Sequence, residues 1–108
     1  MGLIFWKDNK KVDAFANAVA EDLYSHIQPD VADEYFRGVA QKNKKKQRKV
    51  EQRLAGIIGQ MQQFSAANSL GIYGKARLQK HFSDRLLELG YDVSVTNKIV
   101  ETILLQNR

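Results

Sequence analysis

Residues 41–64 read QKNKKKQRKVEQRLAGIIGQMQQF, a run of cations that passes into a regular apolar pattern. The apolar residues are spaced alternately four and three apart, which is typical of a helix with one buried stripe. They are Val50, Leu54, Ile57, Met61 and Phe64. We therefore expect a long, basic, heptad-patterned second helix and an all-α fold.

The helical period also governs the sequence before this stretch. A first stripe begins after Asp8 or Asn9, which are candidate N-caps, and runs through Val12, Phe15, Ala16, Val19, Leu23 and Ile27. Pro29 restricts the residue before it to extended conformations, so the first helix should end near Gln28. The apolar residues 1–7 precede this helix, and we expect them to lie across the helical core as an N-terminal strap.

How far the second helix extends decides how many helices there are. No proline interrupts residues 30–68, and a continuous helix of that range would be ~58 Å long. Since a compact domain of this size has a radius of gyration of ~13 Å, such a helix would extend beyond its own core. It should therefore bend near residues 41–47 or reach a partner.

Two more amphipathic helices are expected after a loop at residues 69–74. The first contains a stripe of Leu78, Phe82, Leu86 and Leu89 and stops at Gly90, where glycine can take the left-handed conformation. The second, capped by Asp92 or Ser94, contains Val95, Ile99, Val100, Ile103 and Leu104. Residues 1–108 should thus form a single compact domain of four helices, or five if the second helix breaks.

Charge is unevenly distributed along the chain, whose formal net charge is +5. Residues 1–36 are acidic, residues 37–53 contain eight basic and one acidic group, and residues 54–108 are nearly balanced. On a helix, five cations of the middle region fall on one stripe. These are Lys42, Lys45, Lys46, Lys49 and Arg53.

Like charges four residues apart repel, so something anionic should lie against this stripe. Solvent salt is one such offset. Another is the set of acidic residues of the first and second helices, in this chain or in a second copy, lying against the stripe. These are Asp13, Glu21, Asp22, Asp33 and Glu34. The third is a nucleic acid bound through its phosphates without base reading, since no aromatic residues interleave with the cations.

Gly56 and Gly59 lie within the best-patterned part of the second helix, where glycine is unfavourable relative to alanine. Close approach of a neighbouring helix would compensate. We therefore expect Gly56 and Gly59, with the heptad residues Val50, Leu54, Ile57, Met61 and Phe64, to form a self-association surface.

Catalytic and cofactor chemistry finds no support in the residue pattern. There is no cysteine, His26 and His81 have no ligand at metal spacing beside them, and no phosphate-binding glycine loop occurs. Apolar runs are too short for a signal peptide or a membrane span. We expect a cytoplasmic protein that is not an enzyme and has no metal, no cofactor and no membrane partner.

The sequence thus favours a non-catalytic helical module that binds another protein or forms a homo-oligomer. Nucleic-acid binding through the basic stripe is the alternative.

Overall fold

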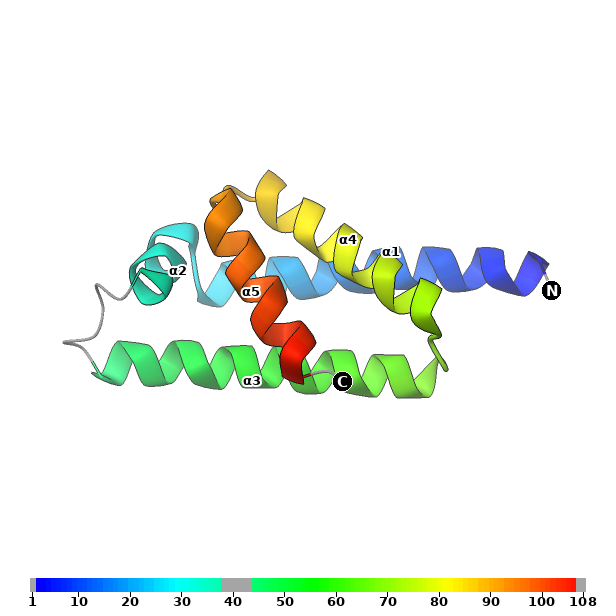
Figure 1. Cartoon of the computed structure of the whole chain (residues 1–108), viewed down its shortest axis with the longest axis horizontal. Coiled ribbons are helices and arrows are strands. Elements are labelled where there is room, and N and C mark those ends of the chain that lie inside the picture. The colour runs from blue at the N-terminus through cyan, green and yellow to red at the C-terminus, as the bar shows by residue number, and fades with distance from the viewer. Residues whose placement is uncertain (1, 38–43, 107–108) are drawn as a thin grey trace.

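The computed structural model describes residues 2–37 and 44–106, and the side chains of residues 9–37 and 44–103 (Figure 1). These residues form five helices and no strand. The helices are α1 (Gly2–His26), α2 (Pro29–Phe36), α3 (Lys44–Ala67), α4 (Ile72–Glu88) and α5 (Val93–Gln106). The prediction of a single all-α domain of four or five helices is confirmed.

Helices α1 and α4 lie side by side and run in the same direction (Figure 1). Three contacts between residues 64 apart fix their register: Asp13 with Arg77, Glu21 with Arg85, and the Tyr91 hydroxyl donating to the Ile27 carbonyl. Because the contacting residues keep the same separation in sequence along the pair, the two helices are parallel and in a fixed register. Helix α3 runs in the opposite direction below them in this view. Helix α5 crosses in front of α1, from the end of α4 toward α3 (Figure 1).

The predicted apolar stripes meet in one core. Helix α4 contributes Leu78, Phe82 and Leu86, and α5 contributes Val95, Ile99, Val100 and Ile103, all buried as expected. Helix α1 supplies Val12, Ala16, Val19 and Leu23, and α3 supplies Val50, Leu54, Ile57 and Met61. Spacing of three and four residues therefore identified the buried faces correctly.

The start of the first helix differs from the prediction. Helix α1 begins at Gly2, so Asp8 and Asn9 lie inside it and residues 2–7 are helical. No proline or glycine follows Gly2 before the apolar stripe, and nothing in this part of the sequence therefore stops the helix from extending toward the N-terminus. The packing of the expected strap's side chains lies outside the described residues.

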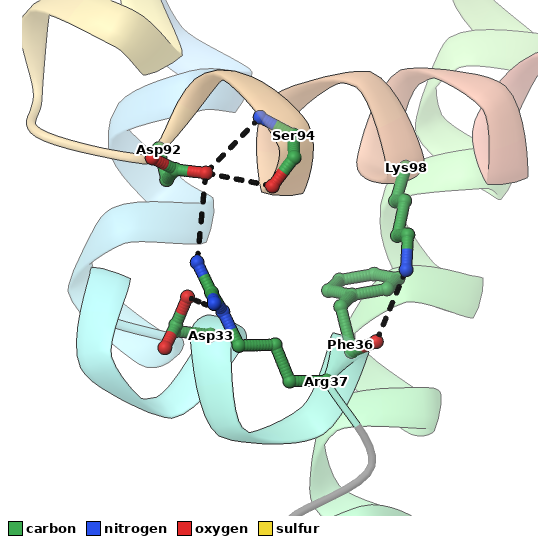
Figure 2. Close-up of polar contacts among 6 residues, drawn as sticks. All are labelled: Asp33, Phe36, Arg37, Asp92, Ser94 and Lys98. Atoms are coloured by element: carbon green, nitrogen blue, oxygen red, sulfur yellow. Dashed lines mark hydrogen bonds and ion pairs between the residues drawn. The ribbon is translucent and has the colours of Figure 1, made fainter.

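The predicted second helix is divided into α2 and α3. Helix α2 ends at Phe36, and Lys98 of α5 donates to the Phe36 carbonyl (3.3 Å), which satisfies an acceptor at the end of the helix (Figure 2). This end precedes the bend expected near residues 41–47. The basic heptad helix is therefore the third helix, and it starts at Lys44.

The turns on either side of α4 follow the sequence in part. Gly71 is the N-cap of α4, so Gly74, expected in the loop, lies inside the helix. At the other end Gly90 has φ +105°, and the Tyr91 amide donates to the Leu86 carbonyl (3.1 Å). This confirms the helix stop predicted at Gly90.

Candidate anion-binding surface

Four of the five predicted stripe cations lie on the N-terminal half of α3, and all four are exposed. We call Lys45, Lys46, Lys49 and Arg53 the basic stripe. The fifth, Lys42, lies outside the described residues.

Two of the acidic residues expected to neutralise the stripe are engaged by α4 instead. Arg77 donates two hydrogen bonds of 2.9 Å to the carboxylate of Asp13, which also lies 3.3 Å from the His81 ring. Arg85 donates to Glu21 at 2.8 Å. These carboxylate hydrogen bonds raise the pKa of both guanidinium groups above its usual value. Helix α4 therefore uses two of its cations at its interface with α1.

Two of the remaining acidic residues, Asp22 and Asp33, have local partners. Asp22 lies 3.5 Å from His26 within α1, and Arg37 donates to Asp33 at 2.6 Å (Figure 2). Arg37 also lies 3.8 Å from Asp92, the residue that caps α5 by accepting from the Ser94 amide (Figure 2). The cap confirms one of the two predicted candidates.

Of the five acidic residues expected at the basic stripe, Glu34 is the one that the described residues show there, through Lys46 at 3.5 Å. Within the described part of the chain, no carboxylate oxygen lies within 4.0 Å of the charged groups of Lys45, Lys49 and Arg53. The prediction that the chain's own acidic residues lie against the stripe is therefore wrong for four of the five residues. The reason is the register of α1 against α4, which turns Asp13 and Glu21 away from α3.

A groove of about 780 Å³ lies where the end of α1 and the start of α2 face α3. Three stripe cations, Lys46, Lys49 and Arg53, line it from α3. Three aliphatic residues also line it, Ile27, Val31 and Val50, of which Ile27 and Val50 are buried and Val31 is partly exposed. The groove therefore combines three cations with a small aliphatic contribution.

Sequence reasoning missed the part of this groove that comes from outside α3. Ser25 and His26 lie at the end of α1 and line the groove, and Val31 comes from the first turn of α2. Pro29 was the available signal, because it turns the chain between α1 and α2. Nothing in the local sequence, however, shows that this corner faces α3.

Unlike the exposed basic stripe, most of the predicted self-association surface is buried. Val50, Leu54, Ile57 and Met61 are buried in the chain's own core, and the ring of Phe64 stacks on Phe15 with centroids 4.0 Å apart. These side chains are therefore occupied within one copy of the chain.

The two glycines of that surface face open space. A Cβ atom built on Gly56 or Gly59 would meet nothing within 4 Å, so none of the described helices approaches them closely. The compensation expected for two helical glycines is thus not found among the residues that the structure describes.

Neither a cluster of metal ligands nor a membrane-spanning helix occurs among the described residues. No group of three histidine, aspartate or glutamate side chains there comes together as metal ligands. None of the described helices is long and apolar enough to cross a membrane.

No protein-family model, curated protein or solved structure matches this chain. Its function must therefore be inferred from its own residues.

Proposed function

We propose that the protein binds nucleic acid through the phosphate backbone, with the basic stripe of α3 as the contact surface. One observation carries this proposal: Lys45, Lys49 and Arg53 have no carboxylate partner in the described residues, whereas Arg77 and Arg85 of α4 do. Exposed cations four residues apart on one helix repel one another. A polyanion that runs along the helix would relieve this repulsion and release its own counterions.

The expected binding is independent of base sequence. Lysine and arginine side chains that contact phosphates position a nucleic acid without reading it. If Lys42 joins the four stripe residues, about five phosphates are neutralised, and the log–log salt slope for duplex DNA is near −4.5. Affinity should then fall roughly 500-fold between about 50 and about 200 mM salt.

The experiment compares two triple variants by fluorescence anisotropy over a salt series. The stripe variant carries Lys45→Gln, Lys49→Gln and Arg53→Gln. The control variant carries Lys10→Gln, Lys11→Gln and Lys75→Gln, three exposed lysines of α1 and α4. Both lose three positive charges, so a difference between them depends on where the charges were.

The stripe variant should bind all sequences more weakly, with a slope reduced by about 2.7, while the control variant stays close to the wild type. Equal losses in the two variants would mean that only net charge matters. No anisotropy change for the wild type at about 50 mM salt would overturn the proposal.

Self-association is a second candidate, and a different observation favours it. Two consecutive large side chains at the start of α4, Ile72 and Tyr73, are 91% and 54% exposed. Adjacent exposed side chains of this kind are a feature of interaction surfaces. In the register of α1 and α4, Ile72 lies level with Asp8, beside the first turns of α1, which extend beyond α4 (Figure 1).

Light-scattering chromatography tests this candidate. Ile72→Glu should dissociate an oligomer formed through this end of the molecule. Val93→Glu is the matched control, because Val93 is 62% exposed at the start of α5, beyond the opposite end of α4. A wild type that is monomeric at high micromolar concentration removes the candidate.

A further inference from the structure

The groove between the α1–α2 corner and α3 offers more than a charged face. An extended phosphate backbone needs only the exposed cations along α3. Lys49 and Arg53, however, also line a concave volume of about 780 Å³, within the range of sites that hold small organic groups. A ligand that enters the groove meets these cations and the partly exposed side chain of Val31.

The three cations that line the groove differ in whether a carboxylate lies near them. Lys46 lies 3.5 Å from Glu34, which offsets its charge. Lys49 and Arg53 have no carboxylate within 4.0 Å in the described part of the chain. Two uncompensated positive charges therefore face the same volume.

The anion that matches two such charges is a phosphomonoester. It carries about −1.5 to −2 charges at pH 7 and three acceptor oxygens, whereas a carboxylate or a backbone phosphodiester carries one charge. Arginine also presents paired donors that suit phosphate oxygens.

The aliphatic lining bears on what is attached to this phosphate. Ile27 and Val50 keep only 4% and 3% of their surface exposed, whereas Val31 is partly exposed. A nucleoside attached to the phosphate would therefore find its apolar contact chiefly on Val31.

We propose that the groove binds the phosphorylated end of a nucleic-acid strand, with the terminal phosphate on Lys49 and Arg53 and the terminal nucleoside against Val31. This inference rests on the proposed function, since the rest of the strand follows the basic stripe. It adds a preference for strand ends that carry a phosphate. Such a preference does not follow from backbone binding alone.

The test uses one single-stranded oligonucleotide in three forms: with a 5′ phosphate, with a 3′ phosphate, and with neither. Binding is followed by anisotropy at about 50 mM salt. At least one phosphorylated form should bind the wild type about tenfold more tightly than the unphosphorylated form, the equivalent of one charge-assisted contact.

Gln52→Glu places a negative charge in the groove, because Gln52 lines it and is exposed. Gln60→Glu is the matched control, the same substitution at an exposed position of α3 outside the groove. Gln52→Glu should abolish the difference between phosphorylated and unphosphorylated forms, and Gln60→Glu should keep it. Circular dichroism checks that both variants remain helical.

The outcomes separate the two proposals. Equal, salt-dependent binding of all three forms would overturn the groove proposal and leave the proposed function standing. Loss of the preference in both glutamine variants would also overturn it, because the terminal phosphate would then act only through overall charge. Absence of binding by every single-stranded form would overturn the groove proposal, whereas the proposed function is decided separately by the duplex salt series.

Discussion

Helices α3 and α4 both present cations along one face, and the two faces differ in what they meet. Arg77 and Arg85 of α4 reach carboxylates of α1 at 2.9 and 2.8 Å, so their charge is used inside the fold. Lys45, Lys49 and Arg53 of α3 meet no carboxylate in the described residues. A basic run in a sequence therefore indicates a binding surface only once the places of the acidic residues are known.

The largest expected effect comes from the apolar contact that holds α4 in place. Phe82 is 2% exposed, and Phe82→Ala should lower the free energy of unfolding by about 3–5 kcal/mol, since it leaves a cavity. Leu87→Ala, on the exposed face of the same helix, should change it little. Urea unfolding measures both variants. A loss below about 1 kcal/mol for Phe82→Ala would show that α4 is not docked as described.

A smaller effect is expected from the ionic contacts of the same interface. Asp13→Asn removes the carboxylate charge shared by Arg77 and His81, and the melting temperature should fall by a few degrees at low salt. Glu101→Gln, at an exposed position of α5, removes the same charge and serves as the control. Equal melting temperatures for the two variants would contradict the structural role of Asp13.

Part of this arrangement follows from the sequence, and part of it does not. The buried stripes at Leu78, Phe82 and Leu86 were predictable, because apolar spacing is a local property. That Arg77 pairs with Asp13, 64 residues away, was not predictable, because it depends on the register of two helices. The groove was missed for the same reason, since its walls come from separate helices.

A third expected effect is a gain in stability on the open face of α3. A Cβ at Gly59 meets nothing within 4 Å, so Gly59→Ala should raise the free energy of unfolding by about 0.4–1 kcal/mol. Gly90→Ala should do the opposite, since φ is +105° there. Chemical denaturation compares the two variants. Destabilisation by Gly59→Ala at high protein concentration alone would instead indicate a second copy packed against this face.

A fourth effect appears only at acid pH and concerns Asp92, which caps α5 and lies near Arg37 at the end of α2. Hydrogen bonds from the Ser94 hydroxyl and amide, with Arg37 nearby, lower the pKa of Asp92. The pKa of Asp92 in the folded state is therefore below its value in the unfolded state, which is about 3.9. The ionised carboxylate contributes its full stability above about pH 3.9, and this stability is lost as the pH falls through the folded pKa.

Asp92→Asn keeps an acceptor for the cap but no longer titrates. Thermal melts between about pH 2 and about pH 7 should show a shallower acid decline for the variant than for the wild type. Parallel declines would mean that Asp92 does not contribute to the acid dependence.

The central claim is that Lys45, Lys49 and Arg53 of α3 have no carboxylate partner in the described residues, whereas Arg77 and Arg85 of α4 do. Two melting temperatures test it most directly. The stripe variant removes Lys45, Lys49 and Arg53, and a double variant, Arg77→Gln with Arg85→Gln, removes the paired cations of α4. At about 50 mM salt the stripe variant should melt at or above the wild type, because each relieved i, i+4 repulsion is worth about 0.2–0.5 kcal/mol. The double variant should melt below the wild type. A stripe variant that melts as far below the wild type as the double variant would contradict the claim.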